Sequence, residues 1–65
     1  MTNLAQKLTK YREEQGLSQK ALAEKADVPQ SSISRIETGL LTNPGIVCLQ
    51  KLAVALNISI SDLTS

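Results

Sequence analysis

Apolar residues recur at helical spacing along the chain, and turn-forming residues separate one periodic stretch from the next. Leu4, Leu8 and Tyr11 lie three or four positions apart, which is the spacing of one face of a helix. This spacing predicts a helix over about residues 3–15, and Gly16 suits the left-handed position that follows a helix end. No stretch shows the alternation of apolar and polar residues that is typical of a β-strand.

A second helix is expected to begin after Ser18, because a serine side chain is a good N-cap. Leu22, Ala23 and Ala26 give this helix a buried face. It must end soon afterwards, because Pro29 disfavours the helical conformation at the residue before it. The pattern therefore predicts a short helix and then a turn of three or four residues.

The third helix is expected to run from about residue 29 to residue 37 or 38, where Gly39 ends it. Ile33 and Ile36 point inward from this helix, and the small Ala23 of the preceding helix leaves room for close packing. Residues 18–38 thus have the organisation of a helix-turn-helix, two short helices joined by a tight turn. Such a pair leaves the outward face of its second helix free to enter a DNA major groove.

The last third of the chain predicts one longer helix and one short one. The longer helix covers Ile46–Leu56, and Asn57 can end it. Ser59 and Asp62 form a capping-box pattern for the final short helix, which ends by about residue 64. The apolar face of the longer helix consists of Ile46, Leu49, Leu52, Ala53 and Leu56.

The two strings GLSQKALAEKA (residues 16–26) and ISRIETG (residues 33–39) resemble the Cro or lambda-repressor type of helix-turn-helix domain, the XRE family. The resemblance covers almost the whole chain and includes the pattern LxxLAxxL of residues 49–56. The loop at residues 41–44 is similar to that of the SinR-like branch. The resemblance implies an all-α fold, a compact five-helix bundle that forms a single domain over residues 1–65, and sequence-specific binding of double-stranded DNA.

The resemblance also implies which residues of the third helix read bases. Gln30 and Ser31 match its first exposed positions, and Ser34 and Arg35 match positions one turn further on. A glutamine amide can pair with adenine through two hydrogen bonds, and an arginine guanidinium can pair with guanine in the same way. The alternative for each residue is an ordinary solvated position, or for Arg35 an ion pair within the chain.

A second group of residues is expected to contact DNA phosphates. Gln19 matches the family's glutamine that contacts phosphate and braces the recognition helix, and Lys20 beside it adds non-specific attraction. Thr38 and the loop residues Thr42 and Asn43 lie near the far end of the recognition helix, where they could donate to further phosphates. The alternative is that they are ordinary surface or turn residues.

Two charged residues match a structural pair rather than a DNA contact. The resemblance implies that Arg12 of the first helix bonds Glu37 at the end of the third. Such a partly buried pair adds little net stability, but the loss of one partner strands the other charge. Asp27 departs from the family by standing where a left-handed glycine is common, a conformation that aspartate tolerates better than most residues.

The charged residues are unevenly distributed. All of them except Lys51 and Asp62 lie within residues 1–37, so residues 38–65 are nearly neutral and aliphatic. A second apolar stripe in this neutral part is a candidate homodimer interface, unless the last helix folds back and covers it. Cys48 beside it is expected to be a small apolar filler. The stripe and the final helix contribute Val47, Val54, Ile58, Ile60 and Leu63 within residues 46–64.

The composition excludes several classes of protein. With one cysteine and no histidine among 65 residues, neither an internal disulfide nor a zinc site is expected, and no cofactor is implied. No apolar run approaches the ~20 residues of a membrane span, so a cytoplasmic protein without a membrane partner is expected. A catalytic role is not expected, because the chain has no histidine and no glycine-rich phosphate loop.

The sequence therefore predicts a DNA-binding transcriptional regulator, most simply a repressor that binds its operator as a homodimer. The net charge of +1 gives this interpretation only weak support. The alternative is a helix-turn-helix module that binds another protein, such as an antitoxin or a partner-binding regulator. An effector protein is compatible with either interpretation, and the sequence does not identify one.

Overall fold

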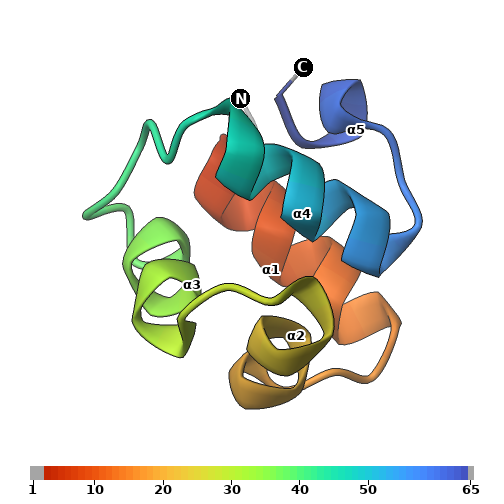
Figure 1. Cartoon of the computed structure of the whole chain (residues 1–65). Helices are drawn as coiled ribbons and strands as arrows, with labels where there is room; N and C mark the ends of the chain where they lie inside the picture. The colour runs from red at the N-terminus through yellow and green to blue at the C-terminus, as the bar shows by residue number, and fades with distance from the viewer. Residues whose placement is uncertain (1–2, 65) are drawn as a thin grey trace.

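The computed structural model describes residues 3–64 and contains five helices and no strand within that range (Figure 1). The expected all-α architecture is confirmed. The longest helices have 11 residues, and none within the described range is long and apolar enough to cross a membrane. The helices are α1 (Leu4–Glu14), α2 (Gln19–Ala26), α3 (Gln30–Glu37), α4 (Ile46–Leu56) and α5 (Ile60–Thr64).

The polar residues between the helices fix where three of them begin. The side chain of Asn3 accepts a hydrogen bond from the backbone N–H of Gln6, and that of Ser18 accepts one from Ala21. At the start of α5 the bonding is reciprocal. The backbone N–H of Ser59 donates to Asp62 at 3.0 Å, and the Asp62 N–H donates to the Ser59 hydroxyl at 3.2 Å. The expected capping box is therefore present.

Left-handed residues end α2 and α4. Asp27 and Asn57 both have a φ of 57°, and no other non-glycine residue in the described part of the chain has a positive φ. The residue after each one donates its N–H back across the turn, from Val28 to the Ala23 carbonyl and from Ile58 to the Ala53 carbonyl. This bonding satisfies carbonyls that the helix end would otherwise leave free. Asp27 thus adopts the conformation expected of glycine at its position.

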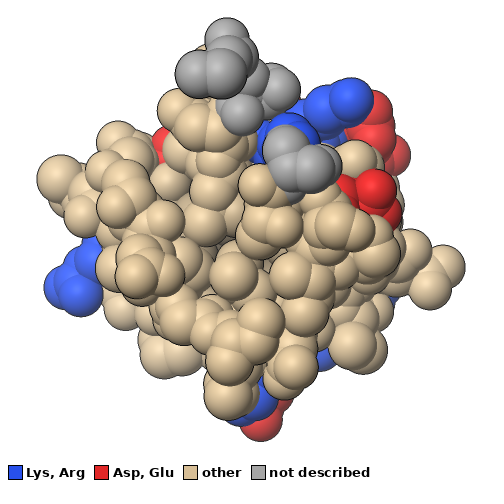
Figure 2. All heavy atoms as spheres, turned by 90° about the horizontal axis from the view of Figure 1, so that it is seen from above, with Lys and Arg blue, Asp and Glu red and all other residues tan. Residues whose placement is uncertain are grey.

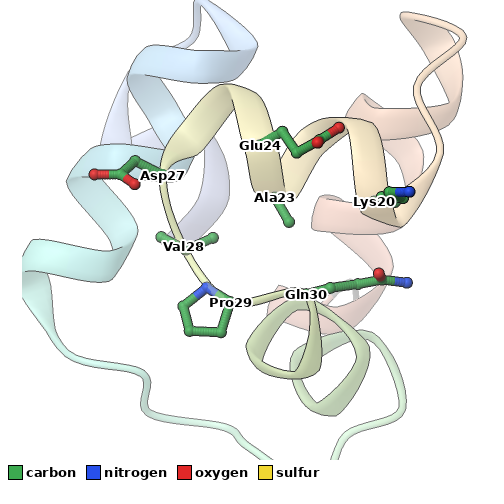
Figure 3. Close-up of a pocket in the computed structure, with 7 residues that line it drawn as sticks. All are labelled: Lys20, Ala23, Glu24, Asp27, Val28, Pro29 and Gln30. Carbon is green, nitrogen blue, oxygen red and sulfur yellow. The ribbon is translucent and has the colours of Figure 1, made fainter.

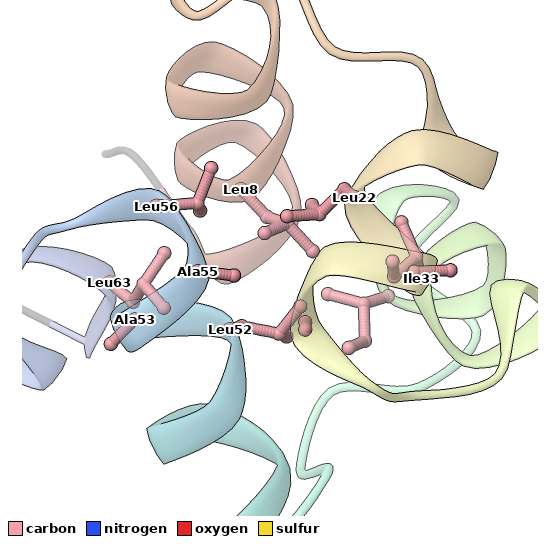
Figure 4. Close-up of a cluster of buried hydrophobic side chains, with 11 residues drawn as sticks. Leu8, Leu22, Ile33, Leu52, Ala53, Ala55, Leu56 and Leu63 are labelled. Atoms are coloured by element: carbon pink, nitrogen blue, oxygen red, sulfur yellow. The ribbon is translucent and has the colours of Figure 1, made fainter.

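The core is aliphatic, and every helix contributes to it (Figure 4). α3 packs on α1 and α2, α4 packs on α2, and α5 packs on α1 and α4. Buried alanines at the contacts let the short helices approach closely, since a larger side chain would separate them. The fully buried large side chains are Leu8, Leu22, Ile33, Ile36, Leu52, Leu56 and Leu63, and the buried alanines are Ala23, Ala26, Ala53 and Ala55.

Two expectations about burial are wrong. Ile46, expected on the buried face of α4, is 57% exposed because it is the first residue of the helix and lies beyond the packed part. Leu63, expected on a partner surface, is 1% exposed. α5 folds back onto both α1 and α4, so Leu63 fills the core of its own chain. Ala55, which the sequence pattern did not place in the core, is buried where α4 meets its neighbours.

Candidate nucleic-acid interface

The outward face of α3 is polar and carries short side chains at its centre. Ile33 and Ile36 are buried on the opposite face, so the 100° rotation per residue directs Ser31 and Thr38 straight outward. Ser34 flanks this line on one side, and Arg35 flanks it on the other. Four positions expected to meet DNA share this face, and Gln30 lies at its edge, toward Lys20 of α2. The four positions are Ser31, Ser34, Arg35 and Thr38.

The start of α3 has no side-chain cap. Pro29 occupies the N-cap position with φ −62° and ψ 139°, an extended conformation that suits proline. Its carbonyl accepts the first bond of the helix, from the Ser32 N–H at 3.1 Å. The N-cap side chain therefore forms no hydrogen bond at this end of the helix, where the helix dipole is positive. Gln30 is the first residue of α3, and its side chain is exposed.

A network of side chains holds the other end of α3. Arg12 of α1 donates from Nε to Glu37 Oε2 at 2.7 Å and from Nη2 to Glu37 Oε1 at 3.0 Å. Gln19, the first residue of α2, donates from Nε2 to the same Oε1 at 3.1 Å. The carboxylate of Glu37 thus joins three helices, and the structure brings together the pair that the family resemblance implies.

Burial and hydrogen bonding have opposite effects on the pKa of Glu37. Its side chain is 7% exposed and that of Arg12 is 13% exposed, so both charges have lost much of their hydration. Burial alone would raise the pKa of Glu37, but the bonds from Arg12 and Gln19 outweigh it and lower the pKa. The bond to Glu37 in turn raises the pKa of Arg12. The pair is therefore ionised and fully bonded.

Arg12 also fixes the loop that leads into the helix-turn-helix. Its Nη1 donates to the backbone carbonyl of Leu17 at 2.8 Å. This bond fixes the approach of the chain to Ser18, the residue that caps α2, and so helps to set where Gln19 and Lys20 lie. The sequence could not predict this bond, because every residue has a backbone carbonyl and only the fold brings that of Leu17 to Arg12.

An open hollow of about 500 Å³ lies between α2 and the start of α3 (Figure 3). Ala23, Val28 and Pro29 supply its apolar part. Lys20 and Glu24 border it from α2, and the amide of Gln30 extends toward the Lys20 end. Glu24 is absent from the residues predicted to act in DNA binding, although it lies one turn from Lys20 on the same helix face.

The residues expected to contact phosphate divide into two groups, one in the first turn of α2 and one after the end of α3. Lys20 borders the hollow at the start of α3, whereas the amide of Gln19 beside it bonds Glu37 at the end of α3. Thr38 follows the end of α3, and its hydroxyl donates to the Arg35 carbonyl at 3.2 Å. Thr42 and Asn43 are exposed in the loop after α3, where they line a hollow with residues at the start of α1.

The surface over α4 is apolar and largely uncharged. Seen from above, the molecule presents a broad area without charged side chains, and the visible Lys, Arg, Asp and Glu side chains lie toward its edges (Figure 2). Val47 is 60% exposed and Val54 is 79% exposed, and their spacing of seven places them on one helix face. Ile58 and Ile60 are half-buried against the core. The candidate interface therefore consists mainly of the two valines, without Leu63.

The remaining chemistry of the described residues is limited. Cys48 is a half-buried thiol whose pKa is raised by burial, against the opposing charge of Lys51. Within residues 3–64, no three side chains of His, Cys, Asp or Glu lie close enough together to hold a metal ion. The polar face of α3 and its supporting network are therefore the best-developed candidate site in the described part of the chain.

Comparison with known proteins gives a family match over most of the chain. The model of a helix-turn-helix family matches residues 8–63. The HTH-type transcriptional regulator SinR of Bacillus subtilis is 43% identical over 60 residues, which are 92% of this chain and 54% of the relative. The chain thus spans about half the length of the curated relative that it matches.

Solved structures of SinR share the fold. A crystal structure of SinR, the master regulator for biofilm formation, in complex with DNA matches with a TM-score of 0.90 and 43% identity. That match covers 92% of this chain and 95% of the other. A complex of SinR with SinI matches with a TM-score of 0.88 at the same identity, over 92% of this chain and 58% of the other.

Proposed function

Because the chain belongs to the helix-turn-helix family of the XRE type and is related to SinR, we propose that it binds double-stranded DNA and regulates transcription. α3 enters the major groove with its polar face toward the bases. The observation that carries this proposal is the set of exposed side chains on one face of α3, together with the Glu37 network that holds the helix to α1 and α2. The SinR–DNA complex, at a TM-score of 0.90, supports it.

The division of roles follows from the two ends of α3. Gln30 and Arg35 have the reach and the donors to pair with adenine and guanine, and the short Ser31 and Ser34 between them permit close approach. Lys20 binds a phosphate beside the start of α3, and Gln19 contacts phosphate from the same turn of α2. The second phosphate group, at the other end of the helix, consists of Thr38, Thr42 and Asn43. Together the two groups fix the register of the helix in the groove.

The functional unit in this proposal is a homodimer that represses transcription in the cytoplasm. Two recognition helices would read half-sites about 34 Å apart, the distance of one turn of DNA. The exposure of Val47 and Val54 supports pairing through α4, with Ile58 and Ile60 at the edge of the contact. Residues 1–65 act as one DNA-binding unit in this proposal, without a catalytic role or a cofactor.

Selection of bound sequences from a random pool of DNA duplexes tests the function. The parent protein is expected to enrich one motif. Gln30→Ala and Arg35→Ala are each expected to relax one or two positions of that motif, because each removes one reader of a base pair. Each good side chain–base pair is worth ~1–3 kcal/mol of discrimination. Lack of enrichment by the parent would contradict DNA reading, and motifs unchanged in both variants would contradict the residue roles.

Sedimentation over a range of protein concentrations tests the homodimer. A dimer that dissociates on dilution is expected, and Val54→Asp is expected to shift the equilibrium to the monomer, because it places a charge in an apolar contact. Thr64→Asp is the matched control, since it adds the same charge at an exposed position of α5. A parent chain of 7.0 kDa that remains monomeric at high concentration would contradict the dimer.

One observation favours a protein partner as a second candidate function. Leu40 is 83% exposed, and the next residue, Leu41, lines a hollow of about 350 Å³ with Val28, Pro44 and Val47 as well as with polar residues. Related SinR is found in a complex with SinI, which supports an effector protein for this chain as well. This candidate would become the leading one if the parent enriched no DNA sequence.

A further inference from the structure

Glu24 places a negative charge on the surface that is proposed to face DNA. This inference rests on the proposed function. We propose that the Glu24 carboxylate restrains sequence-independent affinity for DNA, because it repels the backbone phosphates that Gln19 and Lys20 attract. The restraint acts equally on every DNA sequence, so the choice among sequences remains with the side chains of α3.

The position of Glu24 follows from the helix geometry and from the hollow between α2 and α3. Lys20, Glu24 and Asp27 are spaced by four and three residues, so they share one face of α2 and its C-terminal end. All three are exposed and line the hollow, with Gln30 across from them (Figure 3). A phosphate bound beside Lys20 and Gln30 would therefore also lie near the Glu24 carboxylate, whereas the Asp27 carboxylate extends away from them at the other end of α2 (Figure 3).

The distance from Glu24 to the expected phosphate position is short enough for repulsion in physiological salt. Glu24 follows Lys20 by four residues on the same face of α2, which is about 6 Å along the helix axis. The screening length at 0.15 M salt is about 8 Å, so a charge at this range is weakened but not abolished. Glu24 also lies one turn from Lys20, and its charge offsets that of the lysine.

The repulsion from one carboxylate matters because the surface proposed to bind DNA has almost no net charge. The residues proposed to meet DNA include two cations, Lys20 and Arg35, while Glu24 and Asp27 supply two anions around the hollow that Lys20 lines. The local sum is close to zero, and the chain as a whole carries only +1. Phosphate attraction supplies most of the affinity for arbitrary sequences, so a neutral surface binds such DNA weakly.

The test compares Glu24→Gln with the parent on two duplexes, one carrying the selected motif and one of scrambled sequence. Glu24→Gln keeps the size of the side chain and removes its charge. It is expected to tighten binding to both duplexes by the same factor, about two- to fivefold at 0.15 M salt, the range of a single exposed charge pair. A repeat of the sequence selection is expected to return the parent motif.

Glu14→Gln provides the matched control for the change in net charge. Glu14 is exposed and follows Lys7 by two turns on one flank of α1. Glu14 is two residues from Arg12, which bonds Glu37 of α3, so a rotation of about 200° places Glu14 on the side of α1 away from α3. Glu14→Gln is therefore expected to change affinity for either duplex by less than Glu24→Gln does.

Three results would overturn the inference, and thermal melts of each variant establish that it is folded. The first is an unchanged affinity of folded Glu24→Gln for the scrambled duplex. The second is a changed motif or weaker binding to the selected duplex, because Glu24 would then contact a base rather than repel phosphate. The third is an equal gain from Glu14→Gln, which would indicate a general charge effect. A parent that binds neither duplex would instead contradict the proposed function on which the inference rests.

Discussion

Arg12 and Glu37 lie 25 positions apart in the chain and meet through two hydrogen bonds of 2.7 and 3.0 Å. The guanidinium of the first helix thereby fixes the last residue of the third. Gln19 adds a bond to the same carboxylate at 3.1 Å, and Arg12 reaches back to the Leu17 carbonyl at 2.8 Å. The largely buried ion pair of Arg12 and Glu37 therefore positions the surface that is proposed to read DNA.

Glu37→Ala is expected to weaken folding more than it weakens base discrimination. The substitution leaves the Arg12 guanidinium at 13% exposure without its carboxylate partner. We expect a loss of roughly 2–3 kcal/mol, somewhat less than the loss on breaking a fully buried pair. Thermal and chemical unfolding measure this loss, and sequence selection with the folded fraction measures discrimination. A melting curve identical to that of the parent would contradict the structural role.

The double variant Arg12→Met/Glu37→Leu serves as the control. It removes both charges and so strands neither, and it is expected to be more stable than Glu37→Ala alone. If the double variant lost as much stability as the sum of the losses in Arg12→Met and Glu37→Leu measured singly, the two side chains would be energetically independent. That result would contradict the coupling inferred from their hydrogen bonds.

The same pair predicts a loss of stability in acid. Burial would raise the pKa of Glu37, but the bonds from Arg12 and Gln19 lower it below the ordinary value of 4.5. A carboxylate with a lowered pKa in the folded state stabilises that state fully above its unfolded value. This stabilisation is lost as the pH falls from about 4.5 through the lower folded value. Chemical unfolding at pH 7, 5, 4 and 3 measures the effect.

Glu37→Gln is the control for the acid prediction. Its unfolding free energy is expected to be lower at pH 7 and to change less between pH 5 and pH 3, because the titrating group is gone. The pKa of Asp62 is also lowered by its bonds with Ser59, so some acid dependence should remain in the variant. Parallel curves for the parent and Glu37→Gln would contradict a contribution from Glu37.

Truncation of Leu63 and of Val54 to alanine is expected to affect different properties, folding stability for Leu63 and self-association for Val54. Leu63→Ala removes a side chain that is 1% exposed and should cost about 2–4 kcal/mol of folding stability, as core leucine truncations do. Val54→Ala removes one that is 79% exposed and should change monomer stability by less than about 0.5 kcal/mol. In the proposed dimer, Val54→Ala should also weaken self-association.

Unfolding at low protein concentration measures stability, and sedimentation of the same variants measures association. The reverse pattern, with a stable Leu63→Ala variant that has lost its dimer, would contradict the placement of Leu63 in the core. It would instead support the sequence-based expectation that Leu63 belongs to the partner surface.

The salt dependence of DNA binding is expected to be shallow. The residues proposed to contact DNA include two cations per chain, Lys20 and Arg35, and hence four per dimer. At about 0.9 released counterions per neutralised phosphate, the slope of log affinity against log salt should not exceed about −4. Binding measured between 50 and 200 mM salt checks this value. A slope near −8 would show that further cations contact phosphate.

Sequence patterns located the helices almost to the residue because the signals are local. Ser18, Asp27 and Asn57 act through their own or adjacent backbone, and the structure places each at a helix end. Residues predicted to face DNA were placed by motif position, and the side chains on α3 do share one exposed face. Their roles in binding remain predictions. Glu24 was missed because the motif marks no acidic residue, and only the hollow puts it beside Lys20 and Gln30.

The sequence by itself determined the five helices, their caps and the family, since helix periodicity and capping depend on residues within one turn of each other. Only the tertiary structure decided that α5 folds back and buries Leu63, leaving Val47 and Val54 as the exposed part of the neutral surface. It also selected the Leu17 carbonyl for Arg12 and placed Glu24 at the hollow between α2 and α3. Such relationships depend on the angle and distance at which whole helices pack, and no local pattern of residues encodes these.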